Sequence, residues 1–180
     1  MALPRFTPRL TLRRLLVADL SAFQAYRQSE ELSRYQGWTP QPDSEAIAFL
    51  NEMTSIALFQ PQIWAQIGIA EGVNGPLIGD IGICVSSDGR SADIGFTLSL
   101  AHHGKGLASE AVRETIAMLF DETEIERVIG ITDARNAASM RLLERVGMKL
   151  HSTDKAMFRG EECDEHTYHF ERYAWSGRLA

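Results

Sequence analysis

The sequence predicts one mixed α/β domain that spans residues 1–180. Three β-like runs joined by turns occupy the middle of the chain, two amphipathic helical patterns precede them, and a strand, a helix, a strand and a helix follow in that order. Of the 180 residues, 44% are hydrophobic and 23% are charged, which is typical of a globular protein. A chain of this length can bury a sizeable core.

The first predicted elements are a strand and three helical stretches. The segment TLRRLL, residues 11–16, alternates enough for a strand, and Asp19 suits the N-cap of a helix with apolar residues at helical spacing over 20–26. Ser29 starts a short helical stretch that ends at YQGWTPQP, where glycine and proline interrupt regular structure. A longer amphipathic helix is expected to begin at Asp43, which we expect to act as its N-cap.

The middle of the chain is predicted to be an antiparallel meander. Two apolar runs, residues 63–70 and 77–85, are joined by EGVNGP, whose Asn-Gly pair is a strong hairpin signal. A third strand, residues 92–100, follows the turn SSDGR. Each connection is short, so consecutive strands are expected to lie side by side.

A glycine-rich loop, HHGKGLASEA at residues 102–111, connects the third strand of the meander to a helix with one apolar side. The acidic segment DETEIE then predicts a turn, and RVIGITDA, residues 127–134, predicts a strand. The next segment, RNAASMRLLERVGMKL, predicts a helix that ends at Gly147. This order places the glycine loop at a strand-to-helix junction.

The glycine loop suits an anionic ligand. A helix start has backbone N–H groups without intrahelical partners and a partial positive charge. Gly104 and Gly106 leave room for a phosphate against the backbone, and Lys105 adds a cation. A tight turn whose glycines serve backbone geometry alone is the alternative. A Walker A loop is excluded, because Ser99 replaces its first glycine and Gly106 its Ser or Thr, and a Rossmann fingerprint is absent.

The charge and the cysteine content limit which partners and which cellular compartment we expect. The 18 basic against 24 acidic residues give a formal net charge of −6, which argues against a nucleic-acid partner and favours cationic or amine-bearing small molecules. Cys84 and Cys163 have no metal-type or redox spacing, so we expect no metal and a reducing compartment. The segment MALPRFTPRL lacks the apolar region of a secretory signal, and no apolar run is long enough for a bilayer. The expected location is therefore cytoplasmic, with no membrane partner.

Six motifs occur in order along nearly the whole chain: LRRLLVADLSAF, YQGW, IGFTL, HGKGLASEAV, NAASMRLLERVGM and DEHTYHFERYAW. This ordered set resembles the GNAT acetyltransferases and, within them, the RimJ/RimL-type N-acetyltransferases. The resemblance implies the GNAT fold, a mostly antiparallel sheet that splays open in the middle and is flanked by helices on both faces. It also implies that acetyl-coenzyme A is the co-substrate and lies in the opening of the sheet.

The resemblance assigns residues to acetyl-coenzyme A. Backbone groups near Thr97 and Leu98 would hold the pantetheine arm and the acetyl carbonyl, and the loop amides would bind the pyrophosphate. His103 departs from the Gln or Arg that the family usually has there, and Asn136 resembles the family's coenzyme-contacting asparagine. The predicted set is Thr97, Leu98, His103, Gly104, Lys105, Gly106, Leu107, Ala108, Ser109 and Asn136.

Two residues are predicted to act in catalysis. Acetyl transfer by direct attack needs a neutral amine, a polarised thioester carbonyl and a proton for the departing thiolate. The tyrosine that many relatives use for this proton falls at Leu143, whereas Ser139 resembles a serine of RimJ/RimL-type members; close helix packing is its alternative role. Asp93 resembles the acidic residue before Ile-Gly-Phe and is the candidate base, with a solvent-facing strand residue as the alternative. The other candidate bases are His102, His103, His166, Asp164 and Glu165.

The acceptor side is predicted from YQGW. Tyr35 and Trp38 resemble the segment that contacts the acceptor in the family, and packing over the core is the alternative. The acidic run EECDE, residues 161–165, is expected to be a solvated turn or to line the mouth for a cationic substrate. The predicted function is acetyl transfer to a primary amine, such as a protein N-terminal α-amine. The alternatives are a polyamine or amino sugar as acceptor, and a non-catalytic acyl-coenzyme A-binding module. A homodimer is expected from the family resemblance alone.

Overall fold

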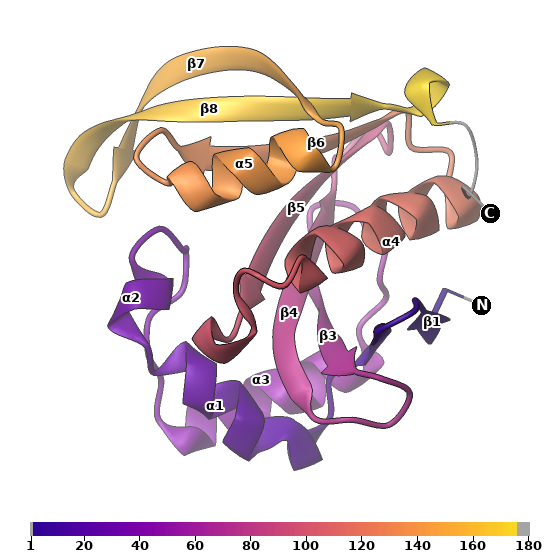
Figure 1. The fold of residues 1–180 in the computed structure, drawn as a ribbon, viewed down its shortest axis with the longest axis vertical. Coiled ribbons are helices and arrows are strands. Elements are labelled where there is room, and N and C mark those ends of the chain that lie inside the picture. Colours follow the sequence, from indigo (N-terminus) through magenta and orange to yellow (C-terminus); the bar gives the residue numbers. More distant parts are fainter. Residues whose placement is uncertain (1, 176–180) are drawn as a thin grey trace.

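One eight-stranded sheet organises the protein, whose computed structural model describes residues 2–175 (Figure 1). The sheet order is β1-β2-β3-β4-β5-β6-β8-β7. The strands are β1 (Arg5–Phe6), β2 (Leu10–Arg14), β3 (Ala65–Glu71), β4 (Leu77–Val85), β5 (Ser91–Leu98), β6 (Arg127–Asp133), β7 (Lys149–Phe158) and β8 (Glu161–Glu171). The helices are α1 (Leu20–Arg27), α2 (Glu30–Ser33), α3 (Asp43–Ser55), α4 (Leu107–Glu122) and α5 (Ala137–Arg145). The mixed α/β class and the antiparallel meander over β3 to β5 are confirmed.

The sheet splits between β5 and β6, the one neighbouring pair that is parallel. Their pairing covers only Ser91–Asp93 against Arg127–Ile129. Beyond this point β5 stays paired with β4 up to Leu98, whereas β6 stays paired with β8 up to Asp133. The sheet is therefore an open one, as predicted, and we call the separation beyond Asp93 and Ile129 the fork.

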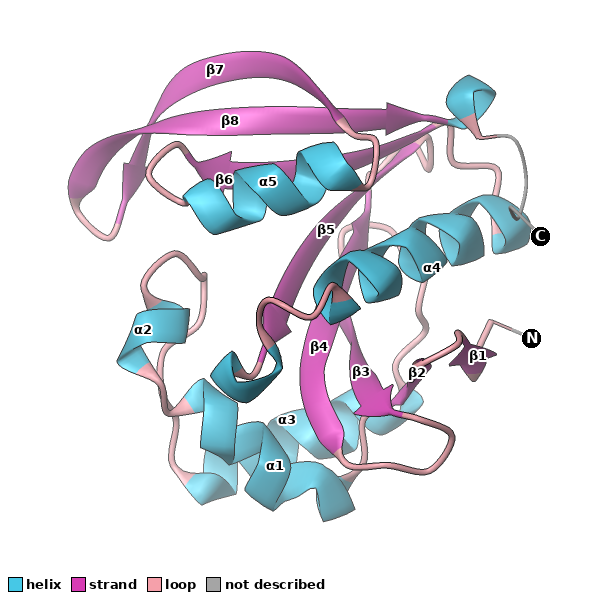
Figure 2. Cartoon of the chain, viewed as in Figure 1, coloured by secondary structure: helices cyan, strands magenta, loops and turns pink. Residues whose placement is uncertain are grey.

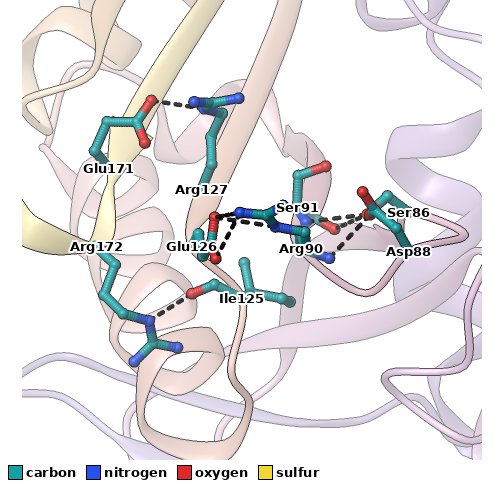
Figure 3. Close-up of polar contacts among 9 residues, drawn as sticks. All are labelled: Ser86, Asp88, Arg90, Ser91, Ile125, Glu126, Arg127, Glu171 and Arg172. Atoms are coloured by element: carbon teal, nitrogen blue, oxygen red, sulfur yellow. Dashed lines mark hydrogen bonds and ion pairs between the residues drawn. The ribbon is translucent and has the colours of Figure 1, made fainter.

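Polar contacts close the other end of this junction (Figure 3). Arg90, just before β5, donates to the carboxylate of Glu126, just before β6, at 2.8 Å, and the backbone N–H of Glu126 donates to the carbonyl of Arg90 at 2.8 Å. Arg127 is paired with Glu171 of β8 at 2.6 Å, and Arg172 donates to the carbonyl of Ile125. Exposed ion pairs add little stability one by one. Together with the backbone bonds they fix the starts of β5 and β6 side by side, so the strands can part only at their other ends.

Helices cover both faces of the sheet (Figure 2), as predicted. Successive side chains of a strand point to opposite faces. In β4, the carboxylate of Asp80 contacts α1, whereas the side chain of Ile81 belongs to the main core, which α4 completes with residues such as Ile116. A second apolar cluster, which includes Phe23 and Leu50, joins α1 and α3 on the Asp80 face. Burial of these apolar side chains is what fixes the helices on the sheet.

Two local expectations were wrong, and a third was correct in position only. Asp19 is the N-cap residue of α1, as predicted, but its side chain makes no cap bond to the helix; its carboxylate is paired with Arg13 at 2.7 Å and accepts the N–H of Leu16. Asp43 is the first residue of α3, and the N-cap position belongs to Pro42. Residues 161–165 are not a turn but the first residues of β8, paired with β7. Ser29 caps α2, as predicted, by accepting the N–H of Leu32.

Neither β7 nor β8 was predicted as a strand from the sequence, although the motif DEHTYHFERYAW overlaps β8. Most side chains of β7 are exposed, so no apolar alternation marks the strand in the sequence. Within residues 2–175, no helix combines the length and the apolar character that crossing a bilayer requires.

Candidate functional site

The fork opens into a groove of about 660 Å³, which we call the donor groove. It is lined by the fork side of β5, the glycine loop, the start of α4, β6 and α5. The predicted coenzyme residues that line it are Thr97, Leu98, His103, Gly104, Gly106, Leu107, Ala108, Ser109 and Asn136. Lys105 is the member of the predicted set that does not line the groove, whereas Ser139 does.

Backbone groups of β5 face the donor groove at alternate residues. The backbone N–H of Ser99 donates to β4, so in the alternating pattern of a strand Thr97 also faces β4. Phe96 and Leu98 face the fork: Gln36 donates to the Phe96 carbonyl at 3.2 Å, and His103 donates to the Leu98 carbonyl at 2.8 Å. Sequence reasoning missed Phe96, because register is needed to tell which residues expose their backbone groups.

The glycine loop has the geometry of an anion site. Gly104 and Gly106 adopt positive φ angles of 73° and 77°, which side chains rarely tolerate. The first intrahelical bond of α4 runs from the N–H of Glu110 to the carbonyl of Gly106. The N–H groups of the three residues before Glu110 therefore have no partner within the helix and point out of its N-terminus.

A cluster of polar residues fastens this loop to the turn between β1 and β2. The Glu110 carboxylate accepts from the hydroxyl of Thr7 at 2.6 Å and from Nε of Arg9 at 2.7 Å, and Arg9 also donates to the carbonyl of Lys105 at 2.8 Å. Partial burial alone would raise the pKa of the Glu110 carboxyl, but the hydrogen bonds from Thr7 and Arg9 lower it overall. The sequence signal for Glu110 was an acid in the first turn of a helix.

The start of α5 is also held by polar contacts. Asn136 is the N-cap, and its side-chain oxygen accepts the N–H of Ser139 at 3.1 Å. Just before it, Arg135 donates to both oxygens of Asp133 and lowers the pKa of that carboxyl to about 2. Asn136 therefore has a structural role in placing Ser139 at the donor groove.

Leu143 lies on the same helix and packs on β6. It is 1% exposed, and a methyl group added at Gly130 would lie only 2.8 Å from its Cδ2 atom. Position 143 therefore holds an apolar side chain packed on β6, and α5 provides no tyrosine hydroxyl to the donor groove at this position. The hydroxyl that α5 does bring to the groove belongs to Ser139.

A second cavity, of about 560 Å³, lies against the α1 side of the sheet, and we call it the acceptor pocket. Gly82 of β4 and Gly95 of β5 are paired in register and share a face, so two neighbouring strands lack side chains at the same place. The predicted residues Tyr35, Trp38 and Asp93 all line this pocket. The two cavities meet along β5, where both are lined by Tyr35, Gln36, Ile94, Gly95, Phe96, Thr97 and Ile131.

Asp93 lies where the fork begins. It belongs to the last paired position of β5 and β6, on the pocket face together with Gly95. Burial raises the pKa of its carboxyl and is the one cause of this shift. A carboxylate with a raised pKa beside an open cavity is suited to accept a proton.

The other candidate bases lie at several different places in the structure. Glu165 lines the acceptor pocket, and His102 lines the donor groove. The ring of His103 is bound to the strand carbonyl described above. Asp164 is paired with Lys155 at 2.9 Å, and His166 lies 2.8 Å from the hydroxyl of Thr153. Of the candidate acids and histidines, Asp93 and Glu165 are the ones that line the acceptor pocket.

A buried charged cluster forms one wall of the acceptor pocket. Arg27 of α1 donates to both oxygens of Asp80 at 2.8 and 2.9 Å, and the Tyr26 hydroxyl donates to the same carboxylate. Burial and the charge of Asp80 raise the pKa of Tyr26, so its hydroxyl stays protonated. The guanidinium of Arg27 also lies 4.5 Å from the ring centre of Trp38. Sequence reasoning missed this cluster, although an Asp within the apolar strand LIGDIGICV was a signal that a buried partner existed.

Comparison with known proteins establishes the family. The model of the acetyltransferase (GNAT) domain matches residues 9–149. The chain belongs to the GNAT family. It is therefore an acyltransferase, and the fold predicted from the sequence motifs is confirmed. A curated relative, the uncharacterized N-acetyltransferase YoaA of Bacillus subtilis, is 30% identical over 145 residues, which cover 79% of this chain and 81% of YoaA.

Solved GNAT structures share the architecture. RimL, a ribosomal L7/L12 α-N-protein acetyltransferase in complex with coenzyme A, has a TM-score of 0.80 at 18% identity, with 93% of this chain and 96% of RimL covered. Spermidine N-acetyltransferase from Vibrio cholerae, in complex with coenzyme A and spermine, has a TM-score of 0.79 at 18% identity, with 93% and 98% covered. At these identities the likeness establishes the fold of this GNAT chain.

Proposed function

We propose that this GNAT enzyme transfers the acetyl group of acetyl-coenzyme A directly to a primary amine while both substrates are bound. The observation that carries the proposal is the junction of the donor groove and the acceptor pocket along residues 94–97 of β5. Because the two cavities share this wall, a thioester held in one lies within reach of a nucleophile held in the other.

The donor groove suits the parts of acetyl-coenzyme A in order. The loop amides after Gly104 and the free N–H groups at the start of α4 would bind the pyrophosphate. Leu98 and Phe96 would offer backbone groups to the amide-containing pantetheine arm, and Thr97 contacts both cavities. Three arginines line the groove and complement the phosphate charges: Arg34, Arg141 and Arg145.

The chemistry is assigned to Asp93 and Ser139. The amine nitrogen bonds to the thioester carbonyl carbon, and its proton goes to the carboxylate of Asp93, directly or through water. The carbon–sulfur bond then breaks, and the Ser139 hydroxyl, which lines the open donor groove, passes its proton to the departing thiolate as it takes one from water. The backbone groups of β5 facing the fork would orient the carbonyl for attack.

A peptide α-amine and a polyamine or amino sugar are the two candidate acceptors. The RimL structure supports the first and the spermidine acetyltransferase structure supports the second equally. Leu143 in place of the usual tyrosine had suggested a non-catalytic acyl-coenzyme A-binding module, but membership of the GNAT family supports an enzyme, and Asp93 lines the acceptor pocket.

Calorimetric titration tests the donor site first. Acetyl-coenzyme A and coenzyme A are expected to bind, and a fragment without the pyrophosphate is expected to bind more weakly. Thiol release is then measured with a panel of amines. Absence of acetyl-coenzyme A binding would refute the donor groove, whereas binding with no turnover on any amine would support the module.

Gly95→Leu should block the junction between the cavities. A Cβ at Gly95 would meet no atom within 4 Å, so the backbone tolerates a side chain that then projects into open space. We expect kcat/KM for the amine to fall about 100-fold, since a misplaced reacting group costs this much. The melting temperature should change little. Steady-state kinetics and thermal unfolding measure the two effects, and unchanged kinetics would show that the acetyl group does not cross this junction.

Ser139→Ala should lower turnover without weakening acetyl-coenzyme A binding. The cap of α5 uses the backbone N–H of Ser139, so alanine removes the hydroxyl and keeps the cap. We expect kcat to fall about 10- to 100-fold, the lower part of the range for proton transfer. Turnover kinetics and calorimetric Kd values are compared. An equal loss in both would make Ser139 a binding or packing residue.

A further inference from the structure

The turn between β7 and β8 carries an arginine where turn geometry favours a different residue. Phe158 of β7 pairs with Glu161 of β8, so Arg159 and Gly160 are the two residues of the turn. Both have positive φ angles, of 52° and 83°, as a type I′ turn requires. Asn-Gly and Asp-Gly are preferred in such turns, because a residue such as arginine rarely adopts a positive φ. The turn itself therefore does not explain the arginine.

The side chain of Arg159 contacts a distant part of the chain. Its Nη2 atom donates to the backbone carbonyl of Trp38 at 2.8 Å and to that of Gln36 at 3.2 Å. Glu161, the acid nearest to it in sequence, lies 3.6 Å from Arg135 instead. The guanidinium is thus bound to two main-chain oxygens more than 120 positions away in the chain.

These two oxygens belong to the segment that connects α2 to α3, residues 34–42, which we call the α2–α3 loop. It contains no helix or strand. At its start the N–H of Gln36 donates to the carbonyl of Ser33 at 3.0 Å, and near its end the carbonyl of Gln41 accepts from Gln24 at 2.9 Å. Between these two points, the main chain of the loop is held by the guanidinium of the β7–β8 turn.

The α2–α3 loop forms a large part of the acceptor pocket. Residues 35–39 and Gln41 all line it, and Tyr35 and Gln36 also line the donor groove. Among the described residues, Arg159 is not part of the lining of either cavity. Any effect of Arg159 on the reaction must therefore pass through the loop that it holds.

The loop is bound from both halves of the divided sheet. Gln36 donates to the carbonyl of Phe96 on β5, whereas the turn that carries Arg159 belongs to the half formed by β6, β8 and β7 (Figure 1). The loop thus bridges the open end of the fork. When the pantetheine arm takes the carbonyl of Phe96, as proposed above, the Gln36 side chain loses this contact. The bonds from Arg159 are then the ones that keep this wall in place.

We infer that Arg159 is a positioning residue for the acceptor amine, because it fixes the wall of the acceptor pocket across the fork through the carbonyls of Gln36 and Trp38. The inference rests on the proposed function and adds a residue outside both cavities to it. A bound amine is oriented towards the thioester by this wall, and correct orientation is a large part of catalysis by direct attack.

Charge alone predicts the opposite effect of removing Arg159. A guanidinium near the mouth of the pocket repels an ammonium substrate, so its loss would improve the binding of a cationic amine. Loss of a positioning contact instead makes the amine a poorer substrate. The direction of the change in kcat/KM therefore distinguishes the two roles.

Arg159→Asn is the decisive variant, because asparagine tolerates the positive φ of this turn and the melting temperature should not fall. Spermidine and alanyl-alaninamide serve as amines of the two candidate classes. We expect kcat/KM for the amine to fall about 10-fold, the size of one net hydrogen bond, with Kd for acetyl-coenzyme A within about 2-fold of wild type. Arg159→Lys keeps a donor and should restore part of the rate. An unchanged or increased kcat/KM in Arg159→Asn would overturn the inference.

Lys155→Gln is the matched control, since it removes one positive charge from the same hairpin. Lys155 contacts Asp164 at 2.9 Å and Glu162 at 3.7 Å, both on β8, and not the α2–α3 loop. We expect its kcat/KM for the amine to stay within about 3-fold of wild type, as for an exposed ion pair. An equal loss in Lys155→Gln and Arg159→Asn would assign the effect to charge and overturn the inference.

A measurement without any amine separates this inference from the proposed function. The amide nitrogens of Gly37 and Thr39 are bonded to the two carbonyls that Arg159 holds, so their ¹H–¹⁵N heteronuclear NOE reports the motion of the wall. With coenzyme A present, both values should fall in Arg159→Asn and stay at wild-type level in Lys155→Gln. Such a fall without acetylation of either amine would refute catalysis on these amines and support the role of Arg159. Unchanged values in Arg159→Asn would overturn the inference even if an amine is acetylated.

Discussion

Asp93→Asn is expected to lower kcat by roughly 10²- to 10⁴-fold, the range that a positioned general base contributes. Asparagine keeps the size of the side chain and removes its ability to take a proton. The Kd for acetyl-coenzyme A should stay unchanged, because Asp93 lines the acceptor pocket and not the donor groove. Steady-state kinetics and calorimetry measure the two quantities.

The pH dependence of activity provides a second test of the role of Asp93. Burial raises the pKa of Asp93, so activity should fall with decreasing pH at a value above the ordinary Asp range of about 3.9. In Asp93→Asn the fall at this pKa should disappear. The separate fall at higher pH, where the acceptor amine becomes protonated, should remain, because the attacking amine must be neutral. A fall at the lower pKa that survives the substitution would assign the base to Glu165 or to water.

The effect of Asp93→Asn on thermal stability at neutral pH should be the opposite of its effect on activity. A carboxyl whose pKa is higher in the folded than in the unfolded state destabilises the fold at neutral pH, where it is charged, and this penalty disappears as pH falls through the raised pKa. Asp93→Asn should therefore raise the melting temperature at pH 7 and lose this advantage in acid. Asp154→Asn, on the exposed part of β7, serves as the control and should change neither activity nor this pH dependence.

Gly106→Val is the second change with a large expected effect. Gly106 has φ +77° at the N-cap of α4, and a β-branched residue is strongly disfavoured there. Its Cβ would also lie 3.6 Å from the Arg9 guanidinium that holds the loop. We expect affinity for acetyl-coenzyme A to fall at least about 100-fold, because the loop amides can no longer converge on a phosphate.

The control for Gly106→Val is Gly89→Val. Gly89 has a similar φ of 71°, lies in the turn between β4 and β5, and has no atom near the position of its Cβ. Both variants carry comparable backbone strain, about 1–3 kcal/mol, so both should unfold at lower temperature. Only Gly106→Val should lose acetyl-coenzyme A binding by calorimetry. Equal binding in the two variants would refute the anion site.

Local signals made much of the fold predictable. The hairpin between β3 and β4, the apolar runs of β3 and β4 and the glycine before α4 are all determined by residues close in sequence. The same holds for Gly147, whose φ of 96° ends α5 as expected. The candidate donor residues were predictable for the same reason, since nearly all of them belong to one strand and the loop after it.

The acceptor pocket depends on residues far apart in the chain, which is why few of its lining residues were named: Tyr35, Trp38, Asp93, Thr97 and Glu165. Arg27 and Asp80 are 53 positions apart, and no local pattern joins them. The acceptor pocket is open over the sheet because Gly82 and Gly95 are paired in register, and this pairing cannot be read from a single sequence. The β7 strand was missed for a different reason: with most side chains in solvent, it lacks the apolar alternation that marks half-buried strands.

The fork has a thermodynamic consequence. Beyond Asp93, the free edge of β5 lacks the neighbouring strand that completes a sheet, and two side chains, Gln36 and His103, occupy two of its carbonyls instead. A bound molecule with its own amides can supply the missing partner. Ligand that binds only the folded chain stabilises it in proportion to the logarithm of its concentration. In the proposed complex the co-substrate would contribute part of the cohesion of this sheet, so the concentration of acetyl-coenzyme A would determine how firmly the two halves are joined.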